Sequence, residues 1–235
     1  MIGNKKILAI IPARGGSKGV PHKNIKKIAG KPLISWTIEE AKKSRYIDRL
    51  ILSSEDNKII EIARSQGCDV PFIRPKHLSE DATPGIDPVL HAINQLPDFD
   101  YVILLQPTSP LRLVEDIDGC IENIVNMGAP ACVSVAETNE SPYWMYTLKE
   151  NKMLKQLIAQ EKEIERRQEL PDVYFTNGAI YVADVNWLLK NGTFLGEETV
   201  AYVMPRNRSY DIDTEDDFYI CEYLLVKKLN DKNGQ

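Results

Sequence analysis

The sequence has few of the features that mark a membrane, secreted or nucleic-acid-binding protein. No run approaches the ~18 apolar residues needed to span a bilayer, and the first residues lack the apolar core and cleavage site of a secretory signal. Basic residues are outnumbered, with 29 Lys+Arg against 34 Asp+Glu, whereas proteins that wrap a nucleic-acid backbone carry a basic face. We therefore expect a cytoplasmic protein with no membrane and no nucleic-acid partner.

Disulfide and zinc-binding patterns are also scarce. The four cysteines are widely spaced with no C-x-x-C pair, and the three histidines are isolated from one another. A chain of 235 residues can build its own apolar core and does not need disulfides. We therefore expect four reduced cysteines packed as small apolar side chains, and no zinc site.

What the sequence does contain is an alternation of short apolar runs with longer amphipathic segments. Continuous runs such as ILAII (7–11) and YVILL (101–105) are typical of strands buried on both faces. The predicted strands are 7–11, 49–53, 70–73, 101–105, 132–136, 179–182 and 200–204, and the predicted helices are 32–45, 56–66, 86–96 and 215–228. This alternation predicts an α/β fold with a mainly parallel sheet and helices on both faces.

The alternation breaks down between residues 137 and 176, where aromatic residues are followed by charged ones. No clean strand–helix pattern covers this stretch, although regular elements return after it. We interpret residues 1–235 as a single domain, with residues 137–176 as an excursion from its sheet that forms a small lobe or an oligomerisation arm.

A glycine-rich basic loop follows the first predicted strand directly, from Pro12 to Gly19 (PARGGSKG). Ligands of open α/β sheets bind beyond the carboxyl ends of the strands, and glycines allow backbone N–H groups to turn toward phosphate oxygens. The side chains of Arg14, Lys18 and Lys23 add positive charge. The loop matches neither G-x-x-x-x-G-K-[ST] nor G-x-G-x-x-G. We interpret it as a phosphate-binding loop; the alternative is a flexible turn with solvated cations.

Near the other end of the chain, Asp211 and Asp213 are two residues apart. In an extended segment their side chains point to the same side, where both carboxylates can face one cation such as Mg²⁺. The competing explanation is structural, because Thr214 with the following acidic residues can form a capping box for the last helix. That explanation leaves Asp211 without a role.

Gln106 lies in a proline-fixed turn, LLQPTSPLR, just past the strand 101–105. The two prolines would hold Gln106 at the carboxyl end of that strand, beside the first loop, where its amide can recognise a base or a sugar hydroxyl. The alternative is an ordinary rigid loop. Arg74 and Asn177 are single candidates that, taken alone, favour structural roles.

In these segments the chain resembles the acylneuraminate cytidylyltransferases. The resemblance covers residues 6–225 and rests on five motifs in order, namely IPARGGSKGVPHKN, FIRP, LLQPTSPLR, NGAIYV and DIDT. It implies a Rossmann-like nucleotidyltransferase fold and transfer of CMP from CTP to the anomeric hydroxyl of a sialic acid or related nonulosonic acid. It also implies a Mg²⁺ cofactor and a homodimer, with residues 137–176 as the dimerisation lobe.

The resemblance also assigns roles to individual residues. The residues that it implies for binding the CTP phosphates and ribose are Ala13, Arg14, Gly15, Lys18, Lys23 and Asn24. Arg74 and Gln106 would line the cytidine and sugar pockets. The sugar is further assigned to Arg167, near its carboxylate, to Asn177 in the NGAIYV motif, and to Phe194, which would reach the N-acyl group from the partner subunit. Arg14, Lys23, Asp211 and Asp213 are the expected catalytic residues. Asp211 and Asp213 would hold Mg²⁺, and Asp211 has general base as an alternative role.

The chain departs from the family pattern at three places. Trp144 stands where some members have a lysine, Phe175-Thr176 where an arginine is frequent, and Pro84-Gly85 where some relatives keep a serine. The first two changes fall on the sugar side, so N-acetylneuraminate, legionaminate and pseudaminate all stay open as acceptors. A nucleotide-sugar glycosyltransferase and a non-catalytic nucleotide-binding module are the rival functions.

Overall fold

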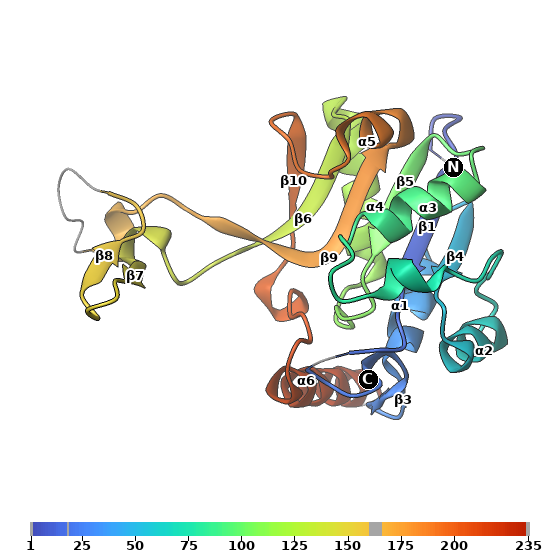
Figure 1. The fold of residues 1–235 in the computed structure, drawn as a ribbon, viewed down its shortest axis with the longest axis horizontal. Coiled ribbons are helices and arrows are strands. Elements are labelled where there is room, and N and C mark those ends of the chain that lie inside the picture. Colours follow the sequence, from blue (N-terminus) through green and yellow to red (C-terminus); the bar gives the residue numbers. More distant parts are fainter. Residues whose placement is uncertain (1, 18, 160–165, 234–235) are drawn as a thin grey trace.

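A computed structural model describes residues 2–17, 19–159 and 166–233. Within these residues the body is built on a six-stranded sheet (Figure 1). The strands in spatial order are β10 (Thr199–Val203), β6 (Ala131–Glu137), β9 (Tyr174–Asp184), β5 (Tyr101–Leu105), β1 (Ile7–Pro12) and β4 (Arg49–Ser53). Only β9 runs antiparallel to its neighbours in this sheet. The predicted mainly parallel sheet is therefore confirmed.

Helices cover both faces of the sheet, as predicted. One face packs against α1 (Leu33–Ala41), α2 (Asn57–Ser65) and α4 (Val114–Met127), and the other against α3 (Asp87–Gln95) and α5 (Val185–Asn191). In β1, Ile7 and Ile11 face the first layer while Leu8 and Ile10 face the second, and all four are fully buried. Burying a side chain of this size stabilises the fold by about 1.5–3 kcal/mol. Apolar runs without polar alternation are therefore what a sheet covered on both faces requires.

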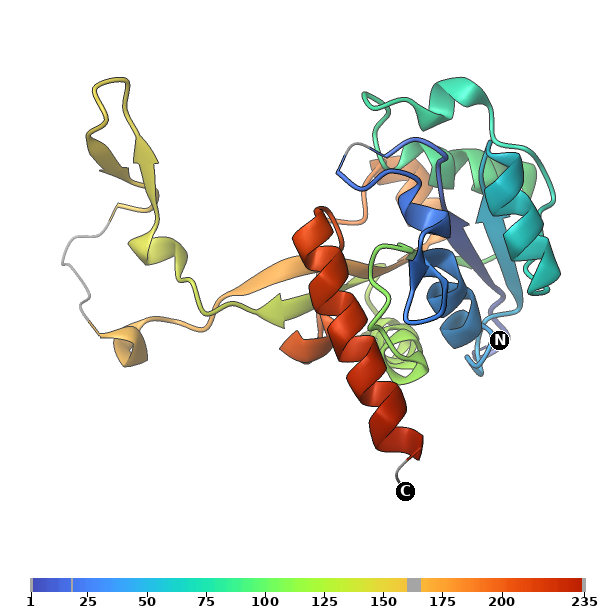
Figure 2. The same ribbon diagram turned by 90° about the horizontal axis from the view of Figure 1, so that it is seen from below.

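The last helix, α6 (Glu215–Asn233), lies outside these two layers, beyond the carboxyl edge of the parallel strands (Figure 2). Its buried side chains, including Phe218 and Leu225, form a separate cluster with Leu33 and Trp36 of α1 and with Ile28 of a small hairpin. The hairpin consists of β2 (Lys27–Ile28) and β3 (Lys31–Pro32). The capping box predicted for this helix is present, because the backbone N–H groups of Thr214 and Asp217 donate to each other's side chains.

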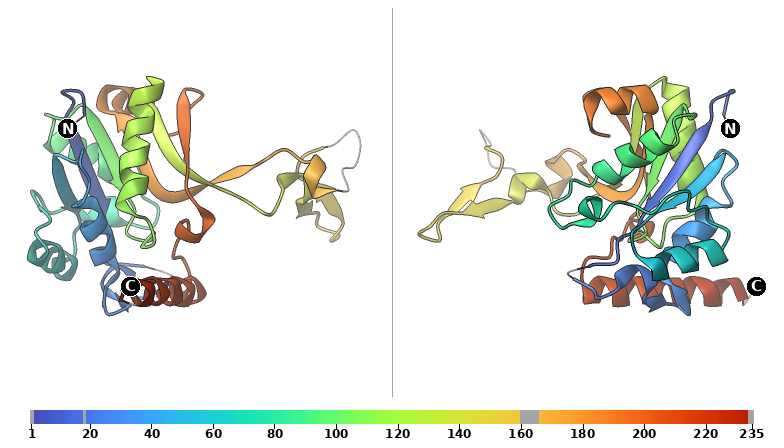
Figure 3. Two further views of the ribbon diagram at one scale, coloured as in Figure 1. Left: turned by 180° about the vertical axis from the view of Figure 1, so that it is seen from behind. Right: turned by 45° about the vertical axis from the view of Figure 1, so that its right-hand side comes forward.

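The described residues between 137 and 176, a stretch expected to leave the sheet, form an arm that projects from the body (Figures 1 and 3). The ends of β6 and β9 pair as a ribbon at its root, and the tip carries a hairpin of β7 (Tyr146–Leu148) and β8 (Leu154–Gln156). Many large apolar side chains are exposed here: Trp144, Met145, Tyr146, Leu148, Met153, Leu154, Leu157, Ile158, Tyr174 and Phe175. Among the described residues, the arm therefore exposes much apolar surface.

Several sequence predictions need correction. Residues 70–73 do not form a strand, and only an isolated bridge joins Asp69 to Ile51. Pro71 explains this, since proline has no N–H to donate to a ladder. The helix predicted over 32–45 begins after Pro32 and ends at Ala41. The strand predicted over 179–182 is the middle of the longer β9, and neither α4 nor α5 was predicted.

All four cysteines are buried and unpaired, as the sequence predicts. No helix in the described part of the chain combines the length and the apolar character needed to cross a membrane.

Candidate functional site

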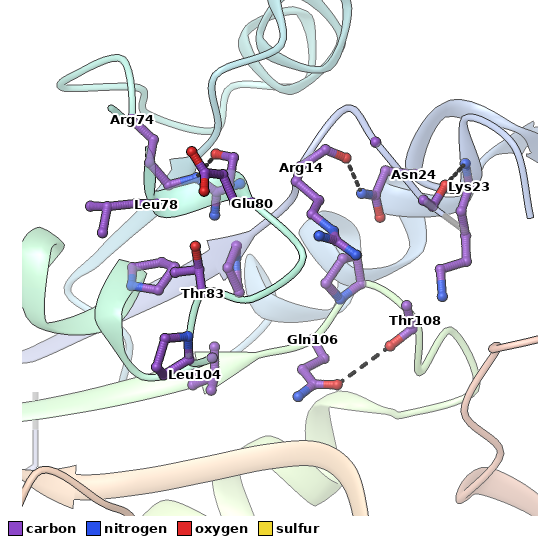
Figure 4. A pocket seen from close by; sticks show the side chains of 18 of the residues that line it. Arg14, Lys23, Asn24, Arg74, Leu78, Glu80, Thr83, Leu104, Gln106 and Thr108 are labelled. Carbon is purple, nitrogen blue, oxygen red and sulfur yellow. Dashed lines mark hydrogen bonds between the residues drawn. The ribbon is translucent and has the colours of Figure 1, made fainter. Parts of the chain in front are cut away.

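A cleft of about 370 Å³ opens where β1 and β5 end (Figure 4). The loop after β1 supplies Arg14, Lys23 and Asn24, and the turn after β5 supplies Gln106 and Thr108. Residues 78–85 form the third wall. Figure 4 shows the Arg14 and Lys23 side chains directed toward the side of the cleft that carries Gln106 and Thr108. The structure thus brings together the first and third sequence motifs at the carboxyl edge of the sheet, where ligands of such folds bind.

The Asp211–Asp213 segment closes the cleft against the same loop. The Lys23 ammonium donates to the carbonyl oxygen of Ile212 at 2.5 Å and lies 3.5 Å from the Asp213 carboxylate. At Gly19 the two backbones approach so closely that an added Cβ would lie 1.9 Å from the Asp213 carbonyl oxygen. Only glycine fits there. Positive and negative groups predicted from opposite ends of the sequence therefore form one site.

Below the phosphate loop, Glu55 joins three segments through buried hydrogen bonds. Its carboxylate accepts from the backbone N–H of Gly15 at 2.7 Å, from the Arg74 guanidinium at 2.8 Å and from the Ser79 hydroxyl at 2.7 Å. Burial disfavours the charged form, but these bonds from Gly15, Ser79 and Arg74 outweigh it and lower the pKa of Glu55. The ionised Glu55 therefore holds the loop of residues 13–19 against residues 74–79.

Sequence reasoning missed Glu55. It directly follows β4, beside the glycine-rich loop after β1, and a carboxylate at that place was the available signal. Arg74, predicted to line the cytidine pocket, does line the cleft, but it is only 4% exposed and its donors are engaged by Glu55 and Ser79. Its main visible role is to shape the wall of the cleft.

The other loop residues divide into structural and accessible groups. Ala13 is buried in the core, and the N–H of Gly15 is donated to Glu55, so both shape the loop rather than line the cleft. Arg14 lines the cleft and pairs with Asp81 at 2.8 Å. Asn24 donates to the carbonyl oxygen of Arg14 at 2.9 Å, while its own side-chain oxygen is buried with no hydrogen-bond partner among the described residues. Lys18 lies outside the described residues.

Gln106 lies beside Asp211 and the root of the arm. A Cβ added at Gly178 would lie 3.2 Å from the side-chain oxygen of Gln106 and 3.7 Å from a carboxylate oxygen of Asp211. Gly178 has φ +74°, in the left-handed region that favours glycine. It therefore permits β9 to pass close to both side chains.

The two aspartates have different surroundings. Burial raises the pKa of Asp211, and a hydrogen bond from Thr108 opposes this only in part. One Asp211 carboxylate oxygen is buried with no hydrogen-bond partner. The Asp213 side chain, by contrast, is 78% exposed. No cluster of three or more metal-binding side chains occurs among the described residues.

A second cleft of about 350 Å³ adjoins the first and shares Gly85, Leu104 and Gln106 with it. Its other walls are largely apolar and include Tyr181 and Phe194, whose rings lie 5.5 Å apart. We expected the partner subunit to supply Phe194. Within one chain, the loop between α5 and β10 places Phe194 in the second cleft, in the same pocket as Gln106, and its reach into a partner subunit stays a prediction. Tyr181 was not predicted, and burial raises the pKa of its hydroxyl.

One predicted sugar-binding residue, Asn177, does not line either cleft. The Asn177 side chain is only 3% exposed and is engaged by Ser134 and Ser209 in the interior. It stabilises the root of the arm and lines neither cleft, and its assignment to the sugar stays a prediction from the resemblance. Arg167 belongs to a short helix in the arm (Arg167–Glu169), and its side chain lies outside the described part of the chain.

Comparison with solved structures identifies the fold. CMP:2-keto-3-deoxy-manno-octonic acid synthetase, solved with CTP, superposes with a TM-score of 0.73 at 16% identity, covering 95% of this chain and 99% of that one. A 4-diphosphocytidyl-2C-methyl-D-erythritol synthase from Anaerococcus prevotii gives a TM-score of 0.66 at 13% identity, covering 94% and 98%. The fold is therefore that of the nucleotidyltransferases, as predicted.

The sequence comparisons narrow this class to a family. Residues 8–203 match the family model described as cytidylyltransferase, so the chain belongs to the cytidylyltransferase family. The CMP-N,N'-diacetyllegionaminic acid synthase of Legionella pneumophila is 34% identical over 226 residues, covering 94% of this chain and 96% of that protein. A pseudaminic acid cytidylyltransferase of Campylobacter jejuni is 35% identical, covering 97% and 99%. The N-acylneuraminate cytidylyltransferase of Escherichia coli is 32% identical, covering 97% of this chain and 54% of that protein.

Proposed function

We propose that this cytidylyltransferase transfers CMP from CTP to the anomeric hydroxyl of a nonulosonic acid, with release of pyrophosphate. The observation that carries the proposal is the pair of adjoining clefts. One is lined by Arg14 and Lys23 and suits a triphosphate, while the other is largely apolar and suits an acylated sugar. Gln106 belongs to both. The two substrates would therefore meet at Gln106 and Asp211.

The reaction is a displacement at phosphorus, in which the anomeric oxygen attacks the α-phosphorus and the bond to pyrophosphate breaks. Such a reaction needs little covalent participation by the protein, because positioning and charge stabilisation supply most of the catalysis. Arg14 and Lys23 would stabilise negative charge on the transferring and leaving phosphates. Asn24 offers its unpartnered buried oxygen to a hydroxyl donor such as the ribose.

Asp211 and Asp213 fit a magnesium ion. Mg²⁺ prefers hard oxygen ligands and usually takes one or two carboxylates, with phosphate oxygens and water completing its octahedron. The buried Asp211 oxygen that has no protein partner is suited to such a ligand role. When bound, the ion would polarise the α-phosphate. The same oxygen suits a general base, which is the alternative role for Asp211.

The acceptor is the open part of the proposal, with sialic, legionaminic and pseudaminic acids as candidates. The test is a pyrophosphate-release assay with CTP and a panel of these acids, with 3-deoxy-manno-octulosonate as the comparison acceptor. We expect rapid release with at least one nine-carbon acid and little with the eight-carbon one. Equal and negligible release across the panel would overturn the proposed function.

We further propose that the arm makes the protein a homodimer. The support is the number of large apolar side chains that it exposes, since patches of this kind mark protein–protein contacts. The test is molar mass by light scattering for Leu154→Glu in the arm and for the matched control Leu189→Glu on α5; these residues are 61% and 47% exposed. We expect Leu154→Glu to have the monomer mass of 26.6 kDa and the control to keep twice that mass. A wild-type protein of monomer mass would contradict the proposal.

The four unpaired cysteines are typical of a reducing compartment, and on this ground we assign the protein to the cytoplasm.

A further inference from the structure

Arg112 is a buried cation that has acidic groups nearby, Asp116 and Glu40 among them, but forms no close ion pair with them. Its side chain is only 1% exposed, and no ion pair between described residues includes it. Burial lowers the pKa of the guanidinium to about 10, which still leaves it charged at neutral pH. A buried charge is costly unless its donors are satisfied. Both terminal nitrogens of Arg112 have partners, whereas its Nε has none among the described residues. What its donors contact therefore indicates what the residue does.

The guanidinium donates to three segments that meet beneath the two clefts. One terminal nitrogen donates to the carbonyl oxygens of Gln106, at 3.1 Å, and Ala179, at 2.6 Å. The other donates to the Thr37 hydroxyl of α1 at 2.7 Å. The planar fork of arginine can serve several acceptors in fixed directions at once, which a lysine ammonium does less well. Arg112 thus ties the turn after β5 to β9 and to α1.

The bond to Ala179 falls where β9 loses its regular pairing. The ladder with β5 ends at Ile180, and the register with β6 jumps from Tyr181 opposite Val133 to Thr176 opposite Val135. Backbone groups in such a bulge need other partners, because unpaired buried carbonyls are unfavourable. Arg112 provides the partner for Ala179.

The bulge is also the part of β9 that lies against the reacting groups. Gly178, next to Ala179, is the residue whose Cβ position approaches Gln106 and Asp211. Arg112 therefore holds the backbone of Gln106 and the backbone of the strand that packs on the Gln106 side chain. If either backbone moved, the Gln106 amide would move relative to Asp211.

We propose that Arg112 is a positioning residue for the acceptor: it sets the Gln106 amide at the junction of the two clefts. The inference rests on the proposed function, in which the acceptor binds at that junction. It assigns no such role toward CTP, because the phosphate loop is held separately by Glu55 and by Lys23. Loss of Arg112 should therefore weaken use of the sugar much more than use of CTP.

The test compares Arg112→Lys and Arg112→Met with a matched control, Arg208→Met. Arg208 donates to the buried Asp116 at 2.9 and 2.6 Å and lines neither cleft, so its loss removes a buried arginine contact without touching Gln106. Pyrophosphate release is measured with each substrate varied in turn, using the acceptor that the wild-type panel identifies. Thermal unfolding is measured alongside.

We expect Arg112→Met to raise the acceptor KM about 10- to 100-fold while the CTP KM changes less than about threefold, as is reasonable for misplacement of a substrate-orienting group. Arg112→Lys should fall between wild type and Arg112→Met. Arg208→Met should lower the unfolding temperature without separating the two KM values. A parallel change in both KM values, or in neither, for the Arg112 variants overturns the inference.

If the Arg112 variants do not fold, Thr37→Val provides the decisive measurement, because it removes one acceptor from the guanidinium at nearly constant volume. We expect a rise of about threefold in acceptor KM alone, and unchanged values for both substrates overturn the inference. Failure of the proposed function is distinguished by the wild-type protein itself, which would then release no pyrophosphate with any acceptor.

Discussion

The two halves of the site are built by different forces. On the CTP side, charged hydrogen bonds dominate: Glu55 holds the phosphate loop to residues 74–79, and Lys23 holds it to Ile212. On the sugar side, Leu104, Tyr181 and Phe194 form largely apolar walls. Charge suits the triphosphate of the proposed donor, whereas apolar walls suit the acylated sugar of the proposed acceptor. The difference suggests that donor and acceptor recognition can be changed separately.

The largest effect should come from Asp211, which lies where the halves meet. Asp211→Ala removes the buried oxygen that we assign to Mg²⁺ or to the attacking hydroxyl, so kcat should fall at least about 100-fold. The measurement is pyrophosphate release at saturating CTP and acceptor. Near-normal turnover would remove Asp211 from the catalytic residues and leave Asp213 as the candidate.

Substitution of Lys23 should impair the use of CTP and leave the use of the acceptor nearly unchanged. Lys23→Met removes a cation from the cleft and its bond to Ile212, so kcat/KM for CTP should fall about 100-fold, with little change in acceptor KM. The matched control is Lys26→Met. Lys26 also reaches the C-terminal segment, pairing with Glu215 at 2.5 Å, but it does not line the cleft. An equal loss in both variants would mean that Lys23 only fastens the two segments together.

Substitution of Phe194 should impair the use of the acceptor and leave the use of CTP nearly unchanged. Phe194→Ala removes an apolar wall of the second cleft and should raise the acceptor KM about tenfold, which corresponds to roughly 1.4 kcal/mol. Phe194→Leu keeps most of the apolar contact and should show a smaller rise. The CTP KM in the same proteins is the internal control. If it rises in step with the acceptor KM, the two halves are not independent.

Substitution of Glu55 should have the smallest effect, which is on the stability of the fold and depends on pH. A carboxylate whose pKa is lower in the folded than in the unfolded state stabilises the fold above its unfolded pKa of about 4.3. This contribution is lost as the pH falls through the lower folded pKa. Glu55→Gln should therefore reduce the free energy of unfolding by about 1–3 kcal/mol at neutral pH.

The difference in free energy of unfolding between the wild type and Glu55→Gln should become smaller as the pH falls below about 4. Urea unfolding of both proteins at a series of pH values measures it. A difference that stays constant with pH would show that the Glu55 charge is not what holds the loop.

Much of the fold could be predicted because burial on both sides of a parallel sheet leaves a direct mark in the sequence. The apolar runs of β1 and β5 and the loop after β1 were identified on that basis. The antiparallel direction of β9 and its bulge were not, because both depend on pairing with β5 and β6 rather than on local pattern. A strand was predicted over residues 70–73 because these residues are mostly apolar, although Pro71 disfavours a strand.

At the site, motifs predicted which segments meet but not what each side chain does there. Arg14, Lys23, Gln106 and Asp213 line the cleft as expected. Asn177 lies in an equally distinctive motif, yet its amide is used in the interior. No role was predicted for Glu55 or Arg112, because each acts through hydrogen bonds to residues far away in the sequence, which motif spacing does not reveal.

The contact between Lys23 and Ile212 also has a consequence for how the protein is made. The two residues are 189 positions apart in the chain, and Gly19 meets Asp213 beside them. A ribosome therefore finishes the phosphate loop long before it makes the segment that closes the cleft. A nascent chain cannot close the cleft in this way until residues 212 and 213 have emerged, so products that stop before them lack a finished cleft.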